Sequence, residues 1–135
     1  MGIPPGVGMT SNSRCWTDRA EAHFATALRE AAVAEDLVPN PQAVIHHAHA
    51  CVQALLRARL AEAGIPFPET PYLMVLLYLC VDLEPAWEEH REAIRTLTTR
   101  FMDAEDPANP IPPERITESL AFCRAFRGLA LAAQA

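Results

Sequence analysis

The chain has 135 residues, which fits one domain that buries about two-thirds of the surface exposed by its unfolded form. Half of the residues are hydrophobic (50%), so the sequence has ample core and is not generally disordered. A net charge of −6 argues against sequence-independent nucleic-acid binding, which needs clustered cations, but it leaves room for a local basic groove. No apolar run approaches the roughly 20 residues that cross a bilayer, so we expect no membrane association.

We divide the chain into a flexible leader, residues 1–15, and a single helical-bundle domain, residues 16–135. The leader is rich in glycine, proline and serine and lacks the basic region and long apolar core of a secretory signal. The cysteines form no C-x-x-C pair, and all except Cys15 fall on apolar helix faces; they are Cys15, Cys51, Cys80 and Cys123. We therefore expect reduced thiols and a cytoplasmic location.

The hydrophobic pattern predicts about five helices and no strand, an all-α up-and-down helical bundle. The first helix runs from about Thr17 to Val38. The second helix begins after Asn40, a capping residue, with Pro41 at its first position. It ends at Gly64, because glycine adopts a left-handed C-terminal conformation at little cost. A cap and a proline at residues 70–71 start a short apolar third helix.

The fourth helix follows residues 82–85 and reaches about Met102. Its acidic and basic residues indicate an exposed, ion-paired face; they are Glu88, Glu89, Arg91, Glu92 and Arg95. Residues 103–113 contain four prolines and three acids and form a loop, and Glu114 opens a fifth helix that continues nearly to the terminus.

The second helix has three faces when its residues are placed 100° apart. A bulky apolar face is expected in the core: Val44, Ala48, Cys51, Val52 and Leu55. A small-residue stripe, interrupted by His47, permits close approach of another helix from this chain or from a second copy: Ala43, Ala50, Ala54, Ala58 and Ala61. A polar stripe is the best candidate for a functional surface: Gln42, His46, His49, Gln53 and Arg57.

The spacing of His46 and His49 places two imidazoles on one side of a helix, an arrangement that zinc accepts. However, no H-E-x-x-H pattern or repeated Glu-x-x-His is present, and Cys51 lies on a different face. We therefore predict no metal ligands and no cofactor. His90 lies in the core-facing series of the fourth helix and is interpreted as an interior histidine. The sequence also has no glycine elbow around a serine and no glycine-rich phosphate loop, so no catalytic residue is predicted.

Two segments point to a family. Residues 47–60 read H-A-H-A-C-V-Q-A-L-L-R-A-R-L, and residues 64–68 read G-I-P-F-P. This resembles the HEPN family, the "higher eukaryotes and prokaryotes nucleotide-binding" domain, whose second helix reads H-A-Q-Q-A-A-E-K-A-L-K-A-L-L before a G-I-x-x-P linker. Residues 70–73 are a loose counterpart of the family's T-H-D-L, and Arg100-Phe101 stands for its R-Y-P. The resemblance covers roughly residues 16–129.

The resemblance implies a short helical bundle that often dimerises and pairs with a minimal nucleotidyltransferase. Other members are ribonuclease toxins, with an arginine followed about a turn later by a histidine on a late helix. Here no histidine follows His90, and Gln53 and Ala54 replace the family's Glu-Lys pair. Arg57 stands at the position of a family lysine and Arg100 in the Arg-Tyr-like motif, and either can meet a phosphate.

Our first hypothesis is a non-catalytic, homodimeric HEPN-like domain that binds a nucleotide, a nucleic acid such as RNA, or a nucleotidyltransferase partner. Its predicted ligand-binding residues are His46, His47, His49, Gln53, Arg57 and Arg100. One alternative is a divergent ribonuclease toxin that uses one of the three histidines of the second helix, and another is a metal-binding helical bundle. Arg19 and His23 are one turn apart on the first helix, which we interpret as a surface coincidence.

Overall fold

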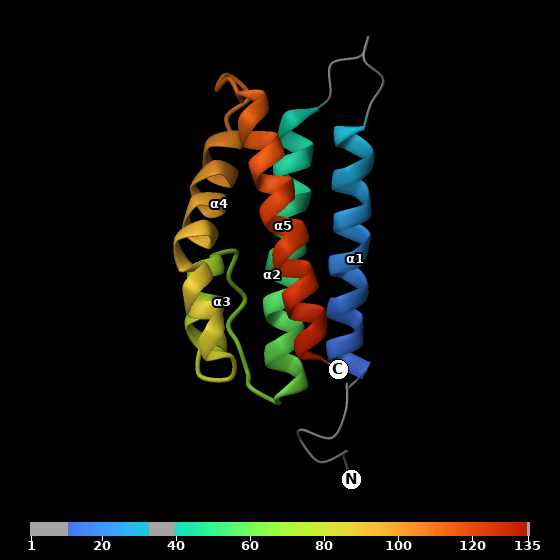
Figure 1. Ribbon diagram of the computed structural model, residues 1–135, viewed down its shortest axis with the longest axis vertical. Helices are drawn as coiled ribbons and strands as arrows, with labels where there is room; N and C mark the ends of the chain where they lie inside the picture. The colour runs from blue at the N-terminus through green and yellow to red at the C-terminus, as the bar shows by residue number, and fades with distance from the viewer. Residues whose placement is uncertain (1–10, 33–39, 135) are drawn as a thin grey trace.

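The computed structural model describes residues 11–32 and 40–134. This part of the chain contains five α-helices, one short 3-10 helix and no strand, which confirms the predicted all-α bundle (Figure 1). In chain order the elements are α1 (Ser11–Ala31), α2 (Pro41–Glu62), α3 (Leu73–Cys80), η1 (Pro85–His90), α4 (Arg91–Ala104) and α5 (Pro113–Ala133).

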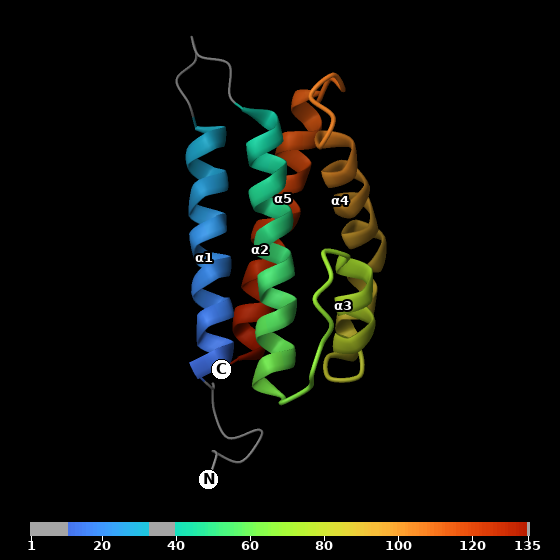
Figure 2. The same ribbon diagram turned by 180° about the vertical axis from the view of Figure 1, so that it is seen from behind.

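The long helices run up and down, and α2 lies at the centre of the bundle. It packs against α1, α3, α4 and α5, and its most extensive contact is with α1. Seen from behind, α2 is flanked by α1 on one side and by α3 and α4 on the other, with α5 on its far side (Figure 2). The candidate site lies where α2 meets α1 and the linker that precedes α3.

The signals predicted at both ends of α2 are confirmed. Asn40 caps the helix, since its side-chain oxygen accepts a hydrogen bond from the backbone N–H of Ala43 at 3.1 Å, and Pro41 follows at the first helical position. At the other end Gly64 has a φ of 72°, the left-handed conformation that glycine adopts without a Cβ clash.

Three other helix boundaries differ from the prediction. α1 begins at Ser11 rather than about Thr17, so residues 11–15 of the predicted leader are helical. The reason is tertiary packing, because Ser13 is buried against the bundle. The predicted end of this helix at Val38, and residues 1–10 of the leader, lie outside the described residues.

The third helix begins at Leu73, two residues later than predicted, because Thr70 does not cap it. Its hydroxyl instead accepts a hydrogen bond from the Tyr72 N–H at 3.2 Å within the linker. The fourth helix is also not uniform: residues 85–90 form the 3-10 helix η1 before α4 starts at Arg91.

The core forms where α2 meets its four neighbours. All five residues of the predicted apolar face of α2 are buried, which confirms that interpretation. The largest buried side chains include Trp87 from η1 and Phe126 from α5, whose ring centroids lie 5.1 Å apart in an edge-to-face arrangement. His90 is half-buried, with its ring centroid 6.1 Å from that of Phe126, in agreement with its interpretation as an interior residue.

The small-residue stripe of α2 faces α1 of the same chain. His47, which interrupts the stripe, contacts His23 of α1, and the buried Ala54 and Ala58 lie on the same side of α2. Of the two partners predicted for the stripe, the structure therefore selects a helix of this chain. The other flank of α1 is tied to α5, where Arg127 forms two hydrogen bonds of 2.9 and 2.8 Å with the Glu21 carboxylate.

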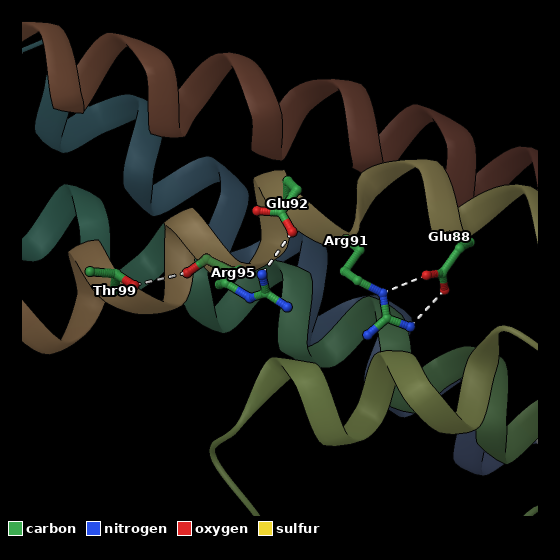
Figure 3. A network of polar contacts seen from close by, with 5 residues as sticks. All are labelled: Glu88, Arg91, Glu92, Arg95 and Thr99. Carbon is green, nitrogen blue, oxygen red and sulfur yellow. Dashed lines mark hydrogen bonds and ion pairs between the residues drawn. The ribbon is translucent and has the colours of Figure 1, made fainter.

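The predicted charged face lies at the η1–α4 junction (Figure 3). Arg91 binds Glu88 at 2.8 Å and Arg95 binds Glu92 at 2.7 Å, each three residues away, and Thr99 donates to the Arg95 carbonyl at 3.2 Å. These pairs are solvent-exposed and screened by water, so they contribute little to the stability of the fold. None of the helices among the described residues has the length and apolarity needed to span a bilayer.

Candidate functional site

A groove of about 630 Å³ lies between the N-terminal half of α1, the C-terminal half of α2 and the linker that precedes α3. We call it the Arg57 groove; it is lined by Trp16, Arg19, Gln53, Arg57, Phe67, Glu69, Thr70 and Pro71. Gln53 and Arg57 belong to the predicted polar stripe, whereas Trp16 and Arg19 come from α1. Its volume lies within the range of about 300–1,000 Å³ that is usual for small-molecule sites.

Arg57 is held firmly in this groove. Its Nη2 donates to the Thr70 carbonyl at 2.9 Å and its Nη1 to the Gln53 side-chain oxygen at 3.4 Å. Its guanidinium carbon lies 4.9 Å from the centre of the Trp16 ring, and that of Arg19 lies 4.7 Å from the same ring. Trp16 also meets Phe67 edge to face at 6.1 Å. The groove therefore presents two guanidinium groups on an aromatic platform.

The charge of the Arg57 groove is only partly balanced by protein groups. Six arginines form ion pairs with carboxylates, namely Arg59, Arg91, Arg95, Arg100, Arg115 and Arg127. Within residues 11–32 and 40–134, no ion pair involves Arg19 or Arg57. Burial, followed by the nearby Arg19 charge, lowers the pKa of Arg57, while Glu69 acts in the opposite direction. An arginine stays protonated at neutral pH, so the groove is suited to an anion.

A histidine pair lies further along the α1–α2 contact. The Nδ1 atoms of His23 and His47 are 2.9 Å apart, so one ring donates a hydrogen bond and the other accepts it. Burial, then the charge of His47, lowers the pKa of His23. Burial, then the charge of His46, lowers the pKa of His47, against a smaller opposite effect of Glu30. Both rings are therefore predominantly neutral at pH 7, the state in which an imidazole accepts a proton.

The two histidines of the polar stripe, His46 and His49, lie beside Phe101 of α4. His46 is exposed and lines a cavity of about 340 Å³ with Gln42 and Phe101. His49 is buried, with 3% of its surface exposed, and stacks on Phe101 with ring centroids 3.9 Å apart. The polar stripe is thus not a uniform open surface, since its middle is covered by α4.

Arg100 does not join the other predicted binding residues. It lies between α4 and α5, where its Nη2 pairs with Glu118 at 2.9 Å, and it lines cavities that contain no residue of the polar stripe. Arg100 lies apart from His49 although the adjacent Phe101 stacks on that histidine, because neighbouring residues on a helix point 100° apart.

The structure adds Trp16, Arg19 and His23 to the candidate site. Trp16 had been assigned to the apolar face of the first helix, and Arg19 with His23 to a surface coincidence. Their spacing of three and four residues places them on one side of α1, which is the side that faces α2. This spacing was visible in the sequence, but the helix that it faces was not.

The chain matches the model of the HEPN domain family over residues 13–132, which is nearly its whole length. With its all-α up-and-down bundle, the chain belongs to the HEPN domain family, a helical family related to nucleotides and RNA. No curated protein and no solved structure matches it. Among the described residues there is no group of three or more His, Cys, Asp or Glu side chains placed to hold a metal ion.

Proposed function

We propose that this HEPN domain is a non-catalytic module that binds a nucleotide, or the phosphate-bearing end of a nucleic acid, in the Arg57 groove. The observation that carries the proposal is the pair of guanidinium groups, Arg19 and Arg57, which lie on Trp16 and form no ion pair with a carboxylate of the described residues. Guanidinium groups recognise phosphate oxygens by paired hydrogen bonds, and aromatic side chains stack on bases and riboses. The family membership supports the same class of ligand.

The three histidines predicted to bind ligand lie at different places along α2. His46, His47 and His49 lie along α2 beyond Gln53, about two to three turns from Arg57. Of the three, His47 contacts His23 of α1, whereas His46 and His49 lie beside Phe101 of α4. Arg100 pairs with Glu118 between α4 and α5, away from the Arg57 groove. It is therefore proposed only as a separate phosphate contact.

Calorimetric titration of adenosine triphosphate tests the proposal. We expect wild type to bind and Arg57→Ala to lose about tenfold or more in affinity, because a charged hydrogen bond contributes about 1.5–3 kcal/mol. Arg91→Ala is the matched control: Arg91 lies at the start of α4, outside the Arg57 groove. Absence of binding, or an equal loss in both variants, contradicts the proposal.

We further propose, following the family resemblance, that the domain acts as a homodimer or docks onto a minimal nucleotidyltransferase in the cytoplasm. Large apolar side chains exposed on and before α3 support a protein contact at this face: Tyr72 (56% exposed), Val75 (40%) and Tyr78 (70%). Free thiols at the described cysteines support a reducing compartment.

A ribonuclease is the second candidate function, and the His23–His47 pair favours it. A neutral imidazole on one ring can take the proton of a ribose hydroxyl, and Arg19, close enough to lower the pKa of His23, can stabilise charge on the phosphate. Cleavage of single-stranded RNA by wild type but not by His47→Gln supports this function. Equal RNA recovery with wild type, His23→Gln and His47→Gln excludes it.

A further inference from the structure

Two histidine side chains meet across the contact between α1 and α2. The Nδ1 atoms of His23 and His47 are 2.9 Å apart, and the two rings are inclined by 31° with their centroids 5.1 Å apart. Both side chains are only partly buried, so two imidazole nitrogens from different helices converge near the surface of the bundle. On sequence grounds only His46 and His49 were considered as a metal-binding pair, and these share one helix.

Both rings of the pair are in the protonation state that binds metal ions. Burial, then the charge of His47, lowers the pKa of His23, and burial, then the charge of His46, lowers the pKa of His47. The neutral imidazole is the commonest metal ligand in proteins. A bound ion takes the place of the proton between the two Nδ1 atoms. The ring that donates this proton then carries it on Nε2, so no net proton is released.

The separation of the two nitrogens favours one kind of coordination. Bonds from a metal ion to imidazole nitrogen are about 2.0–2.1 Å long, so two nitrogens 2.9 Å apart subtend an angle of about 90° at a shared ion. A tetrahedral ion with the same bond length needs its nitrogens about 3.3 Å apart. An angle near 90° is that of neighbouring ligands in the square-planar or tetragonal coordination of Cu²⁺ and Ni²⁺ by nitrogen and oxygen.

The charged groups around the pair act in both directions. Glu30 raises the pKa of His47 and therefore favours a cation, whereas Arg19 lowers the pKa of His23 and Arg29 that of His47, so both arginines act against a cation. Charge alone therefore does not hold an ion here. The affinity has to come from bonds to imidazole, which a transition metal forms and a hard cation such as Mg²⁺ does not.

We propose that His23 and His47 form a two-histidine site for a divalent transition-metal ion of the Cu²⁺ or Ni²⁺ type, with water at the remaining coordination positions. The ion joins α1 to α2, so its binding stabilises the folded chain over the unfolded one. This site goes beyond the proposed nucleotide binding and does not depend on it, because neither histidine lines the Arg57 groove.

Thermal unfolding of the full-length, tag-free chain with and without Ni²⁺ tests the site. Ni²⁺ is the probe because, unlike Cu²⁺, it does not oxidise an exposed thiol such as that of Cys15. At about ten times the dissociation constant measured by calorimetric titration, Ni²⁺ should raise the unfolding midpoint of wild type by about 4 °C. His23→Gln and His47→Gln each remove one ligand and should lose most of this rise, measured from their own metal-free midpoints. His90→Gln is the matched control; His90 lies in η1, and the variant should retain the full rise.

The titration itself should give one Ni²⁺ per chain in wild type, with an affinity at least tenfold lower in His23→Gln and in His47→Gln. Mg²⁺ at the same concentration should leave the midpoint of wild type unchanged. A wild-type midpoint that does not respond to Ni²⁺ overturns the site, and so does a rise that is as large in both pair variants as in wild type. An equal rise with Mg²⁺ is a general ionic effect and also overturns it. None of these results depends on whether the chain binds a nucleotide.

Discussion

Replacing His49 with phenylalanine should change how the stability of the protein depends on pH. The pKa of His49 is lowered from 6.5 to about 4, chiefly by burial and then by the charge of His46. The unfolded chain therefore takes up a proton near pH 6.5, whereas the folded chain resists protonation until about pH 4. Because the unfolded state binds more protons between these values, stability is present above pH 6.5 and falls as the pH decreases through this window.

The magnitude follows from the two pKa values. A difference between 6.5 and about 4 corresponds to about 3 kcal/mol of unfolding free energy lost below pH 4, at 1.36 kcal/mol per pH unit. Of this, about 2 kcal/mol is lost between pH 7 and pH 5. That is a large share of the roughly 5–15 kcal/mol that stabilises a typical domain.

Urea unfolding at pH 7 and pH 5 measures the effect in wild type and His49→Phe. The lowered pKa values of His23 and His47 act in the same direction in both proteins, so the difference between the two pH dependences isolates His49. We expect the variant to lose about 2 kcal/mol less than wild type between pH 7 and pH 5. At pH 7 it should match or exceed wild type by about 1 kcal/mol, since the variant removes the buried His49 Nε2, which has no hydrogen-bond partner among the described residues.

Ile94→Val is the control, because it trims a buried side chain without changing a titratable group. It should cost about 0.5–1.5 kcal/mol equally at both pH values. A pH dependence of His49→Phe equal to that of wild type refutes the reasoning, since it means that His49 is not held neutral by burial.

The other predictions concern separate parts of the chain. In the native protein, only Cys15 among the described cysteines should react quickly with a thiol reagent, because it is exposed while Cys51, Cys80 and Cys123 are buried. Burial also raises the pKa of Cys80 to about 12. Fast reaction of several thiols in the folded state contradicts this prediction. Gly128→Ala should stabilise the protein by about 0.5–1 kcal/mol, since an added Cβ on helix α5 meets nothing within 4 Å. Gly64→Ala should destabilise it by about 1 kcal/mol, because Gly64 has a φ of 72°. Thermal unfolding in which Gly64→Ala is the more stable variant is inconsistent with the fold. If the α3 face joins two copies, light scattering should give the mass of a dimer for wild type and of a monomer for Val75→Glu, and a wild-type monomer removes that proposal.

The central helix was predictable because its determinants are local. Asn40, Pro41 and Gly64 mark its ends by their own chemistry, and the apolar residues between them repeat at helical spacing. The early start of α1 and the 3-10 turn before α4 were not predicted, since both depend on packing against other elements, as the buried Ser13 and Trp87 show.

The candidate site was predictable only in part. The polar stripe on α2 supplied Gln53 and Arg57, but the Arg57 groove exists because α1 brings Trp16 and Arg19 beside them and the linker brings Thr70. A single helix pattern does not say which side chains of another helix will face it. For the same reason His49 was assigned to the polar stripe as part of a functional surface, whereas Phe101 of α4 covers it.

The most direct test of the account follows the arginine Nε–H signals by NMR while adenosine triphosphate is added to the isotope-labelled protein. We predict that the Arg19 and Arg57 signals move together and saturate with one dissociation constant, while those of Arg91 and Arg95 on the charged face of Figure 3 stay in place. Movement of Arg91 and Arg95 without Arg19 and Arg57, or no movement at all, contradicts the claim that the Arg57 groove receives the phosphates.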